Sequence, residues 1–144
     1  MILGMGSDLC DIRRIERSIA RFGDRFLERA FTPVERAYAD RRSGMARIGT
    51  YAKRWAAKEA CAKALGTGFN NGVFLRDIGV RNRPGGAPML ELTNGARAAL
   101  GRLVPARMQA SIVLTMTDEV PYAMAQVLIQ ALPAEGIATG TVMG

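Results

Sequence analysis

The segment from Met45 to Leu65 constrains the fold more than any other, because its alanine-rich sequence predicts one long helix. Gly66 follows directly, and glycine is the residue at which helices most often end. The second half of this helix carries small side chains, which are typical where another element packs close to a helix: Ala56, Ala57, Ala60, Ala62 and Ala64. We therefore predict a central helix with a partner packed tightly against it.

Alternating apolar residues predict strands on both sides of this helix. In residues 1–10, Leu3, Met5 and Leu9 lie on one face, whereas the other face holds two glycines and Asp8. By itself this segment favours Asp8 as the end of the strand and the cap of the next helix. Further strands are expected over residues 73–81, 88–92, 108–117 and 122–130, the last two as a hairpin.

Shorter helices are expected between these strands. Residues 11–22 have a helical period that Gly23 breaks or bends. The sequence 32–35, Thr-Pro-Val-Glu, predicts a capping box, and its helix ends near residues 41–44. Thr93 begins a short helix that runs to about Leu103. Because no repeat or linker interrupts the chain, we expect one domain over residues 1–132 and a flexible tail over residues 133–144.

The chain of 144 residues contains no histidine, and this absence narrows its chemistry. It excludes histidine general bases, Ser-His-Asp and Cys-His nucleophile systems and most zinc sites. A metal would have to be held by carboxylates, which favour a hard ion such as Mg²⁺.

Positive charge is concentrated in the first part of the chain. Residues 1–64 carry 14 basic and 8 acidic groups, whereas residues 65–144 carry 6 and 5. An excess of positive charge on one part of the chain predicts an anionic partner: nucleic acid, a phosphorylated small molecule, an acidic protein or a membrane surface. Arg14, Arg17 and Arg21 share one side of the predicted helix, and Arg25 continues their row. This row is either a solvated face or a docking surface for an acidic helix.

The compartment is predicted from what the sequence lacks. Cys10 and Cys61 are too few for a disulfide scaffold and are expected to be buried thiols. The chain begins without a signal-peptide pattern, and no apolar stretch approaches the ~18 residues of a membrane span. We expect a cytoplasmic protein that is not embedded in a membrane.

Glu59 and Lys63 form the most informative pair, because a spacing of four residues places them on one helix face. As an isolated pair they are best explained as a surface ion pair. The small neighbours and the loop Gly66-Thr67-Gly68 suggest more, since backbone amides of such a loop can lie against phosphates. The alternative is that the loop simply ends the helix.

Three separated blocks of sequence resemble one known family. They are Gly4-Met5-Gly6-Ser7-Asp8 with Ile12 and Arg14-Ile15; Phe31-Thr32-Pro33-Val34-Glu35 with Arg54 to Ala60 and Lys63 to Gly68; and Tyr122 to Val127. Their order and spacing over roughly residues 1–130 are similar to those of the holo-acyl-carrier-protein synthases, the small trimeric group of phosphopantetheinyl transferases.

The resemblance implies an α+β fold, in which an antiparallel sheet packs with a long helix, assembled as a homotrimer. It also implies transfer of the phosphopantetheine arm of coenzyme A to a serine of apo acyl carrier protein, with release of adenosine 3',5'-bisphosphate. Phosphoryl transfer depends on positioning and charge neutralisation, which a site without histidine can supply.

The resemblance also assigns roles to residues. Asp8 and Glu59 would hold Mg²⁺, Glu59 or a water would accept the serine proton, and Lys63 would contact the phosphates. Coenzyme A would be lined by Arg54, Lys63, Gly66, Thr67, Gly68 and Asp118. The acidic helix of the carrier protein would dock on Arg14, Arg17, Arg21 and Arg25.

Asp118 departs from the family pattern, which commonly has a histidine at this place in the last hairpin. A carboxylate there either takes part in the site or caps the turn. This departure keeps open a non-catalytic binder of coenzyme A or carrier protein. A basic nucleic-acid-binding module is a weaker alternative, because no aromatic residues alternate with the arginines and no nucleic-acid-binding motif is recognisable.

Overall fold

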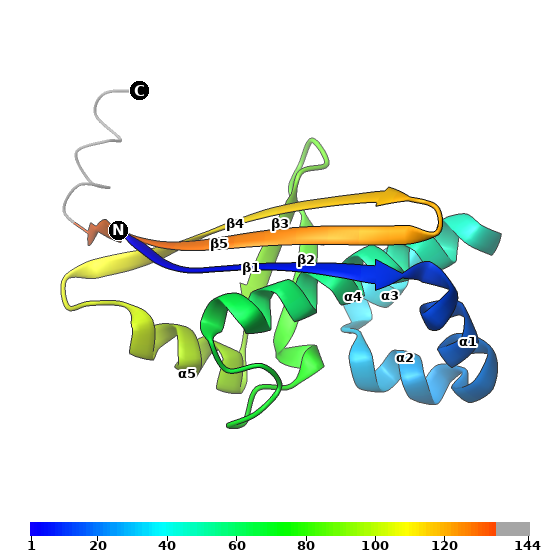
Figure 1. Cartoon of the computed structure of the whole chain (residues 1–144), viewed down its shortest axis with the longest axis horizontal. Helices are drawn as coiled ribbons and strands as arrows, with labels where there is room; N and C mark the ends of the chain where they lie inside the picture. Colours follow the sequence, from blue (N-terminus) through cyan, green and yellow to red (C-terminus); the bar gives the residue numbers. More distant parts are fainter. Residues whose placement is uncertain (135–144) are drawn as a thin grey trace.

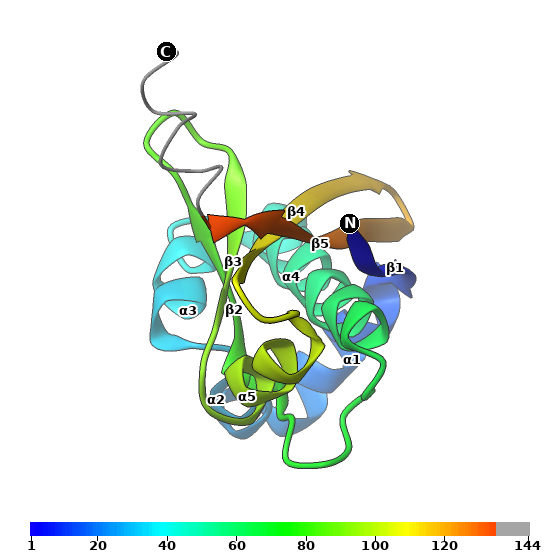
Figure 2. The same cartoon turned by 90° about the vertical axis from the view of Figure 1, so that its left-hand side faces the viewer.

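A 22-residue helix, α4 (Gly44–Leu65), runs beneath a three-stranded antiparallel sheet. The computed structural model describes residues 1–134. The strands are β1 (Ile2–Asp11), β4 (Met108–Glu119) and β5 (Tyr122–Pro133), in the order β1-β5-β4. Figure 1 shows these strands side by side, and Figure 2 shows α4 against one face of the sheet. The expected α+β fold with a sheet on a long helix is therefore confirmed.

The remaining elements surround α4. Three short helices follow β1: α1 (Ile12–Phe22), α2 (Asp24–Ala30) and α3 (Pro33–Ala39). Beyond α4, a single 3-10 turn η1 (Leu75–Asp77) leads into a separate two-stranded hairpin of β2 (Ile78–Asn82) and β3 (Pro88–Leu92). Helix α5 (Asn94–Leu103) then connects the hairpin to β4. No helix within residues 1–134 is both long and apolar enough to cross a membrane.

The glycine face of β1 is the one that packs on α4. A Cβ atom built at Gly4 would lie 2.0 Å from the carbonyl oxygen of Ala64, and one at Gly6 would lie 2.0 Å from that of Ala60. These glycines let the strand backbone rest directly on the helix backbone. The predicted close partner of α4 is thus β1, with the buried alanines and valine of β5 beside it.

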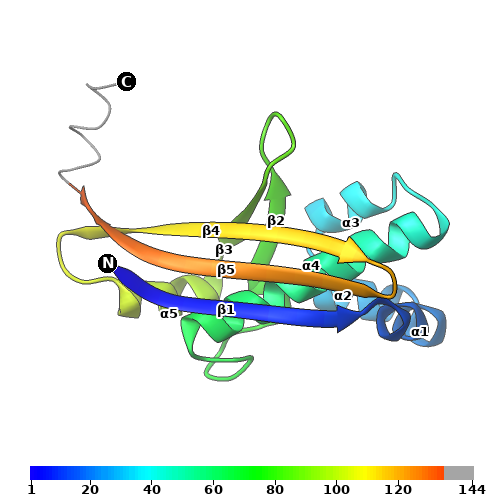
Figure 3. The same ribbon diagram turned by 45° about the horizontal axis from the view of Figure 1, so that its top comes forward.

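The other face of this sheet is left uncovered. Met5 and Leu9 of β1 are 65% and 62% exposed, and Val113 of β4 is 51% exposed. In Figure 3 the sheet lies in front of the helices, so no helix of residues 1–134 covers this face. Exposed aliphatic side chains gathered on one face of a sheet are typical of a surface that binds another protein.

Local sequence signals predicted most elements, but several boundaries differ. The helix that begins at Pro33 ends at Ala39 and not near residues 41–44. The strand expected over residues 73–81 begins only at Ile78, because Asp77 accepts a hydrogen bond from the Phe74 amide and closes a 3-10 turn. The last two strands extend beyond their expected ends, to Glu119 and Pro133. The tail was expected to begin at residue 133, but Pro133 still belongs to β5. Residues 135–144 of the expected tail lie outside the described residues.

The start of α3 follows the expected chemistry, whereas the Thr93 side chain before α5 accepts no capping hydrogen bond. Thr32 and Glu35 form the predicted capping box, with Thr32 N to Glu35 Oε1 at 2.8 Å and Glu35 N to Thr32 Oγ1 at 3.2 Å. The cap of α1 is Asp11, which accepts from the Arg13 amide at 3.0 Å. The alternative in which Asp8 caps this helix is therefore wrong, and the Asp8 side chain is free for another role.

Candidate functional site

Asp8, Glu59 and Lys63 lie together between β1 and α4, and we call these three residues the acidic centre. Asp8 follows the two glycines on the helix-facing side of β1. Lys63 Nζ lies 3.3 Å from Asp8 Oδ1 and donates a hydrogen bond of 2.9 Å to the Ser7 carbonyl oxygen. The Asp8 side chain is 17% exposed, so this carboxylate is largely enclosed yet reachable from solvent.

The pKa of the Glu59 carboxyl depends on burial and on the charges around it. Partial burial raises the pKa of Glu59, and the neighbouring carboxylate of Asp8 raises it further, against the opposing influence of Arg14 and Lys63. The acidic centre thus holds two carboxylates whose mutual repulsion is opposed by Arg14 and Lys63.

These residues fit a hard divalent cation. Mg²⁺ is commonly bound by one or two carboxylates together with phosphate oxygens of a substrate. The described residues contain no group of three or more acidic, cysteine or histidine side chains that could hold a metal without such help. The nearby Cys10 does not add a ligand, because burial raises the pKa of its thiol to about 11 and keeps it protonated.

A second group of charged residues lines a pocket of about 210 Å³ between α4 and the β2–β3 hairpin. We call it the basic pocket, since its walls include Arg42, Lys53 and Arg54. Asn82 and Gly86 of the hairpin form the opposite side. This arrangement presents three cations to a ligand that would enter between the helix and the hairpin.

Arg54 is the most buried of these cations, at 2% exposure. Its Nη2 donates to Asn82 Oδ1 at 2.9 Å, and its guanidinium lies 4.3 Å from the ring centre of Tyr38. Burial lowers the pKa of Arg54, with the carboxylate of Glu35 opposing this effect. Its buried Nε has no hydrogen-bond acceptor within residues 1–134, so this side chain retains a donor for an anion.

Comparison with known proteins establishes the family. Residues 4–117 match the model of the 4'-phosphopantetheinyl transferase superfamily. The chain belongs to this superfamily. A curated holo-[acyl-carrier-protein] synthase of Gluconobacter oxydans is 65% identical over 137 residues, which cover 95% of this chain and 87% of that protein.

Solved structures of phosphopantetheinyl transferases share the fold. The holo-[acyl-carrier-protein] synthase of Neisseria meningitidis matches with a TM-score of 0.78 and 32% identity, covering 90% of this chain and 99% of that one. The corresponding protein of Helicobacter pylori, solved in complex with coenzyme A, matches with a TM-score of 0.73 and 28% identity over 88% and 99% of the two chains.

Asp118, which departs from the family pattern, pairs with Lys53, a residue that lines the basic pocket. Its Oδ1 is 3.7 Å from Lys53 Nζ, and the two side chains are 41% and 29% exposed. Within the part of the chain that the structure describes, its carboxylate accepts no hydrogen bond from the turn that follows. The turn-capping alternative is therefore not what the structure shows.

The two groups of predicted transferase residues do not meet within one chain. Asp8 pairs with Ala125 of β5, and Ala125 pairs in turn with Met116 of β4, two residues before Asp118. Two strand spacings separate β1 from β4, which is about 10 Å. Asp8, Glu59 and Lys63 are thus brought together, whereas Arg54 lines the basic pocket and Asp118 pairs with Lys53 at that pocket.

The loop 66–68 caps α4. The Gly66 amide donates to the Lys63 carbonyl oxygen, and the amides of Thr67 and Gly68 donate to that of Ala62 at 3.3 and 3.2 Å. These amides are consequently not free to bind phosphate, so the capping alternative is the correct one for them. Gly66, Thr67 and Gly68 as coenzyme-lining positions stay a prediction.

The arginine row of α1 and α2 is exposed along its whole length. Arg14, Arg17 and Arg21 border one surface hollow together with Phe22. Arg14 also stacks over Trp55 of α4, with its guanidinium carbon 5.7 Å from the ring centre. Arg14, whose charge acts on Glu59, is therefore the member of the row beside the acidic centre, and the later arginines follow along α1 and α2.

Sequence reasoning missed Lys53, Arg42 and Asn82 as pocket residues, and it gave no role to Lys58. A signal for Lys58 was present, because it lies four residues after Arg54 on a helix face otherwise made of small and apolar residues. The pocket itself had no local signal, since Asn82 comes from a hairpin far along the chain.

Proposed function

We propose that this chain is a holo-acyl-carrier-protein synthase, which moves the 4'-phosphopantetheine arm of coenzyme A to a serine hydroxyl of apo acyl carrier protein. The observation that carries this proposal is the meeting of Asp8, Glu59 and Lys63 in a chain 65% identical to a synthase of that name. The reaction releases adenosine 3',5'-bisphosphate.

The acidic centre is proposed as the reacting end of the site. The serine oxygen attacks the phosphorus that carries the pantetheine arm, and the bond to the bisphosphate breaks. Glu59, directly or through a water, accepts the serine proton, and its raised pKa makes its carboxylate a stronger base than an exposed glutamate. Lys63 moves from Asp8 to the phosphates and stabilises the leaving group.

Mg²⁺ is proposed as the metal, held by Asp8 and Glu59. When bound, it neutralises the charge of the pyrophosphate. The support for this assignment is that β1 and α4 each supply one carboxylate to the acidic centre, and that the charge of Asp8 raises the pKa of Glu59.

The basic pocket is proposed to hold the anionic nucleotide end of coenzyme A. Arg54 supports this role because its buried Nε still lacks an acceptor. Lys53 supplies a second cation, and Asp118 is proposed to act through it, because the two side chains are paired at 3.7 Å.

A homotrimer with sites between subunits is proposed for the assembly. One chain keeps the acidic centre and the basic pocket apart, and the outer face of its sheet exposes Met5, Leu9 and Val113. A neighbouring copy on this face would bury these side chains and bring the basic pocket of one subunit toward the acidic centre of another.

The carrier protein is proposed to dock on Arg14, Arg17, Arg21 and Arg25. These exposed cations start beside the acidic centre, so an acidic helix bound to them would lie near the reacting groups. The cytoplasm is proposed as the compartment, and the two free buried cysteines agree with a reducing environment.

Mass spectrometry of the carrier protein tests the function. The purified chain is incubated with coenzyme A, Mg²⁺ and apo acyl carrier protein, and we expect the carrier to gain the mass of one phosphopantetheinyl group. Binding of coenzyme A without this mass increase would identify a non-catalytic binder instead.

A further inference from the structure

Lys58 and Glu35 form an ion pair at the centre of the molecule that the proposed chemistry does not use. Lys58 Nζ lies 2.7 Å from Glu35 Oε1, and both side chains are 0% exposed. We call these two residues the buried pair. Lys58 is adjacent to Glu59 in sequence but points away from the acidic centre, toward α3 and the β2–β3 hairpin.

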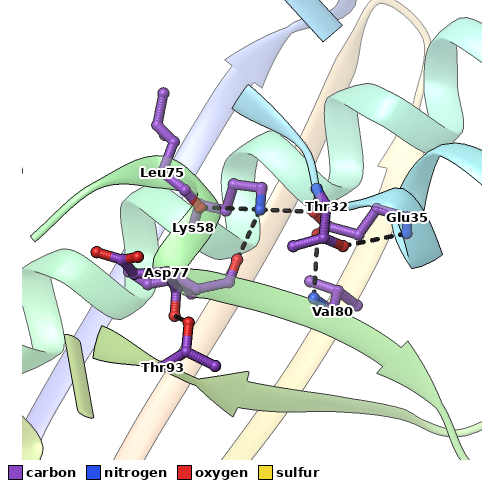
Figure 4. Close-up of polar contacts among 8 residues, drawn as sticks. Thr32, Glu35, Lys58, Leu75, Asp77, Val80 and Thr93 are labelled. Carbon is purple, nitrogen blue, oxygen red and sulfur yellow. Dashed lines mark hydrogen bonds and ion pairs between the residues drawn. The ribbon is translucent and has the colours of Figure 1, made fainter. Parts of the chain in front are cut away.

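Every polar atom of the buried pair is engaged, mostly with the main chain (Figure 4). Lys58 Nζ also donates to the carbonyl oxygens of Leu75 at 3.0 Å and Ile78 at 2.6 Å. Glu35 accepts from the Thr32 amide at 2.8 Å and, through Oε2, from the Val80 amide at 3.0 Å. The pair therefore connects the start of α3, the middle of α4 and the first strand of the hairpin.

Stability alone does not account for such a pair. Burying two charges is costly, and apolar side chains of similar volume are often equally stable in their place. Apolar side chains cannot, however, hold main-chain groups of three elements in one relative position. What the pair supplies is a defined geometry between α4 and the hairpin.

The hairpin needs such an anchor. In the part of the chain that the structure describes, strands β2 and β3 pair only with each other and do not continue the ladder of the larger sheet. An isolated two-stranded hairpin is marginally stable, so its position depends on what attaches it to the domain. Its far end projects beyond the edge of the main sheet (Figure 3).

The anchored strand carries one wall of the basic pocket. Val80, which binds Glu35, is two residues before Asn82, which binds Arg54. Lys58 and Arg54 are one helical turn apart on α4, so both helix residues contact the same strand. A shift of the hairpin would therefore move Asn82 and Gly86 away from Arg54.

We propose that Glu35 and Lys58 are positioning residues, which hold the β2–β3 hairpin against α4 and thereby keep the basic pocket closed around the nucleotide end of coenzyme A. The functional part of this inference rests on the proposed function. The structural part, that the pair holds the hairpin, does not.

The test is a double variant, Glu35→Gln with Lys58→Met, which removes both charges together. Single neutralisation would leave one buried charge uncompensated and could unfold the chain. We expect the double variant to retain its melting temperature within a few degrees. Amide hydrogen exchange in the free protein should be faster at Val80 and its hairpin neighbours and unchanged in β1 and β5.

The same variant separates coenzyme binding from the other steps. The KM for coenzyme A and the Kd for adenosine 3',5'-bisphosphate should rise about tenfold, which corresponds to the loss of one hydrogen bond to a charged group. The KM for the carrier protein should stay within about twofold, because none of the hydrogen bonds of the buried pair involves the arginine row.

Glu91→Gln is the matched control, since it removes the exposed ion pair with Arg81 on the same hairpin. It should leave the exchange rates and the KM for coenzyme A as in the wild type. If the double variant does not fold, Glu35→Asp keeps the charges balanced but shortens the reach to the Val80 amide. It should then show the faster hairpin exchange.

Unchanged hairpin exchange in the folded variant overturns the positioning role, and faster exchange with an unchanged KM for coenzyme A overturns its link to the pocket. Absence of transfer in the wild type would instead refute the proposed function. The exchange measurement needs no coenzyme, so it would still decide whether the buried pair holds the hairpin.

Discussion

At the scale of single residues, Glu59 combines a proposed catalytic role with an unfavourable environment. Burial and the Asp8 carboxylate raise its pKa above the ordinary value of 4.5. The folded state therefore favours the protonated form, and folding loses stability as the pH rises from that ordinary value through the raised one. Above this window the charged carboxylate destabilises the fold by a constant amount.

Glu59→Gln should for this reason stabilise the protein while it removes transfer. We expect kcat/KM to fall at least about 100-fold, equivalent to about 3 kcal/mol of transition-state stabilisation. The melting temperature at pH 7.5 should rise by about 2 °C, and this gain should shrink as the pH falls toward 4.5. Calorimetry at the two pH values checks it, and a lower melting temperature at pH 7.5 would contradict the electrostatic argument.

Asp118 offers a second test at this scale. Asp118→Asn should raise the KM for coenzyme A about threefold, because Lys53 loses the partner that holds it at the basic pocket. The melting temperature should change by less than about 1 °C, since a half-exposed ion pair contributes little to stability. Kinetics at varied coenzyme concentration provide the measurement.

A double-mutant cycle tests whether Asp118 affects the KM for coenzyme A through Lys53. In a Lys53→Gln background, Asp118→Asn should have no further effect on the KM for coenzyme A. An equal effect in both backgrounds would mean that Asp118 acts independently of Lys53. A clear fall in melting temperature would restore the turn-capping explanation.

At the scale of elements, the contact between β1 and α4 places Asp8 at Lys63. A Cβ at Gly6 would meet the Ala60 carbonyl oxygen at 2.0 Å, and backbone atoms on both sides cannot move independently. Gly6→Ala should therefore lower the free energy of unfolding by about 3 kcal/mol and reduce transfer as Asp8 moves away. Urea denaturation and the transfer assay measure the two effects.

Gly101→Ala is the control for this substitution. Gly101 lies in α5, and nothing lies within 4 Å of a Cβ atom at this position. Alanine there should stabilise the protein by about 0.5 kcal/mol, because it restricts the unfolded chain and favours the helix. Equal stability of the Gly6→Ala variant and the wild type would show that the strand can shift on the helix.

At the scale of the whole molecule, the uneven charge should govern the encounter with the carrier protein. Raising the salt concentration should lower kcat/KM for the carrier, because exposed charges are screened over ~10 Å at 0.1 M. Arg17→Glu should raise the KM for the carrier about tenfold and leave that for coenzyme A unchanged. A salt-insensitive wild type would place the carrier elsewhere.

The uncovered sheet face gives a prediction about assembly. Leu9→Asp places a charge among the exposed aliphatic side chains of β1, so the proposed trimer should dissociate into monomers. Transfer should be lost with it, because the acidic centre and the basic pocket are separate in one chain. Analytical ultracentrifugation checks the mass, and an active monomer would contradict the shared site.

Local sequence determined much of this protein. The long helix with its glycine stop, the capping box of Thr32 and Glu35, and the shared face of Glu59 and Lys63 each depend on residues within one or two turns of each other. The alternation in residues 1–10 also placed the two glycines and Asp8 on the same face of the first strand. These features follow from backbone preferences and periodicity, which act between near neighbours.

Tertiary structure decided the rest, because the deciding contacts join residues far apart in the chain. Lys63 and Asp8 meet across 55 positions, and Lys58 and Glu35 across 23. The residue types alone fitted a surface ion pair at position 63, and the apolar helix face around Lys58 did not identify Glu35 as its partner. Only the packing of β1 and the hairpin on opposite sides of α4 made one lysine part of a reactive centre and the other a buried anchor.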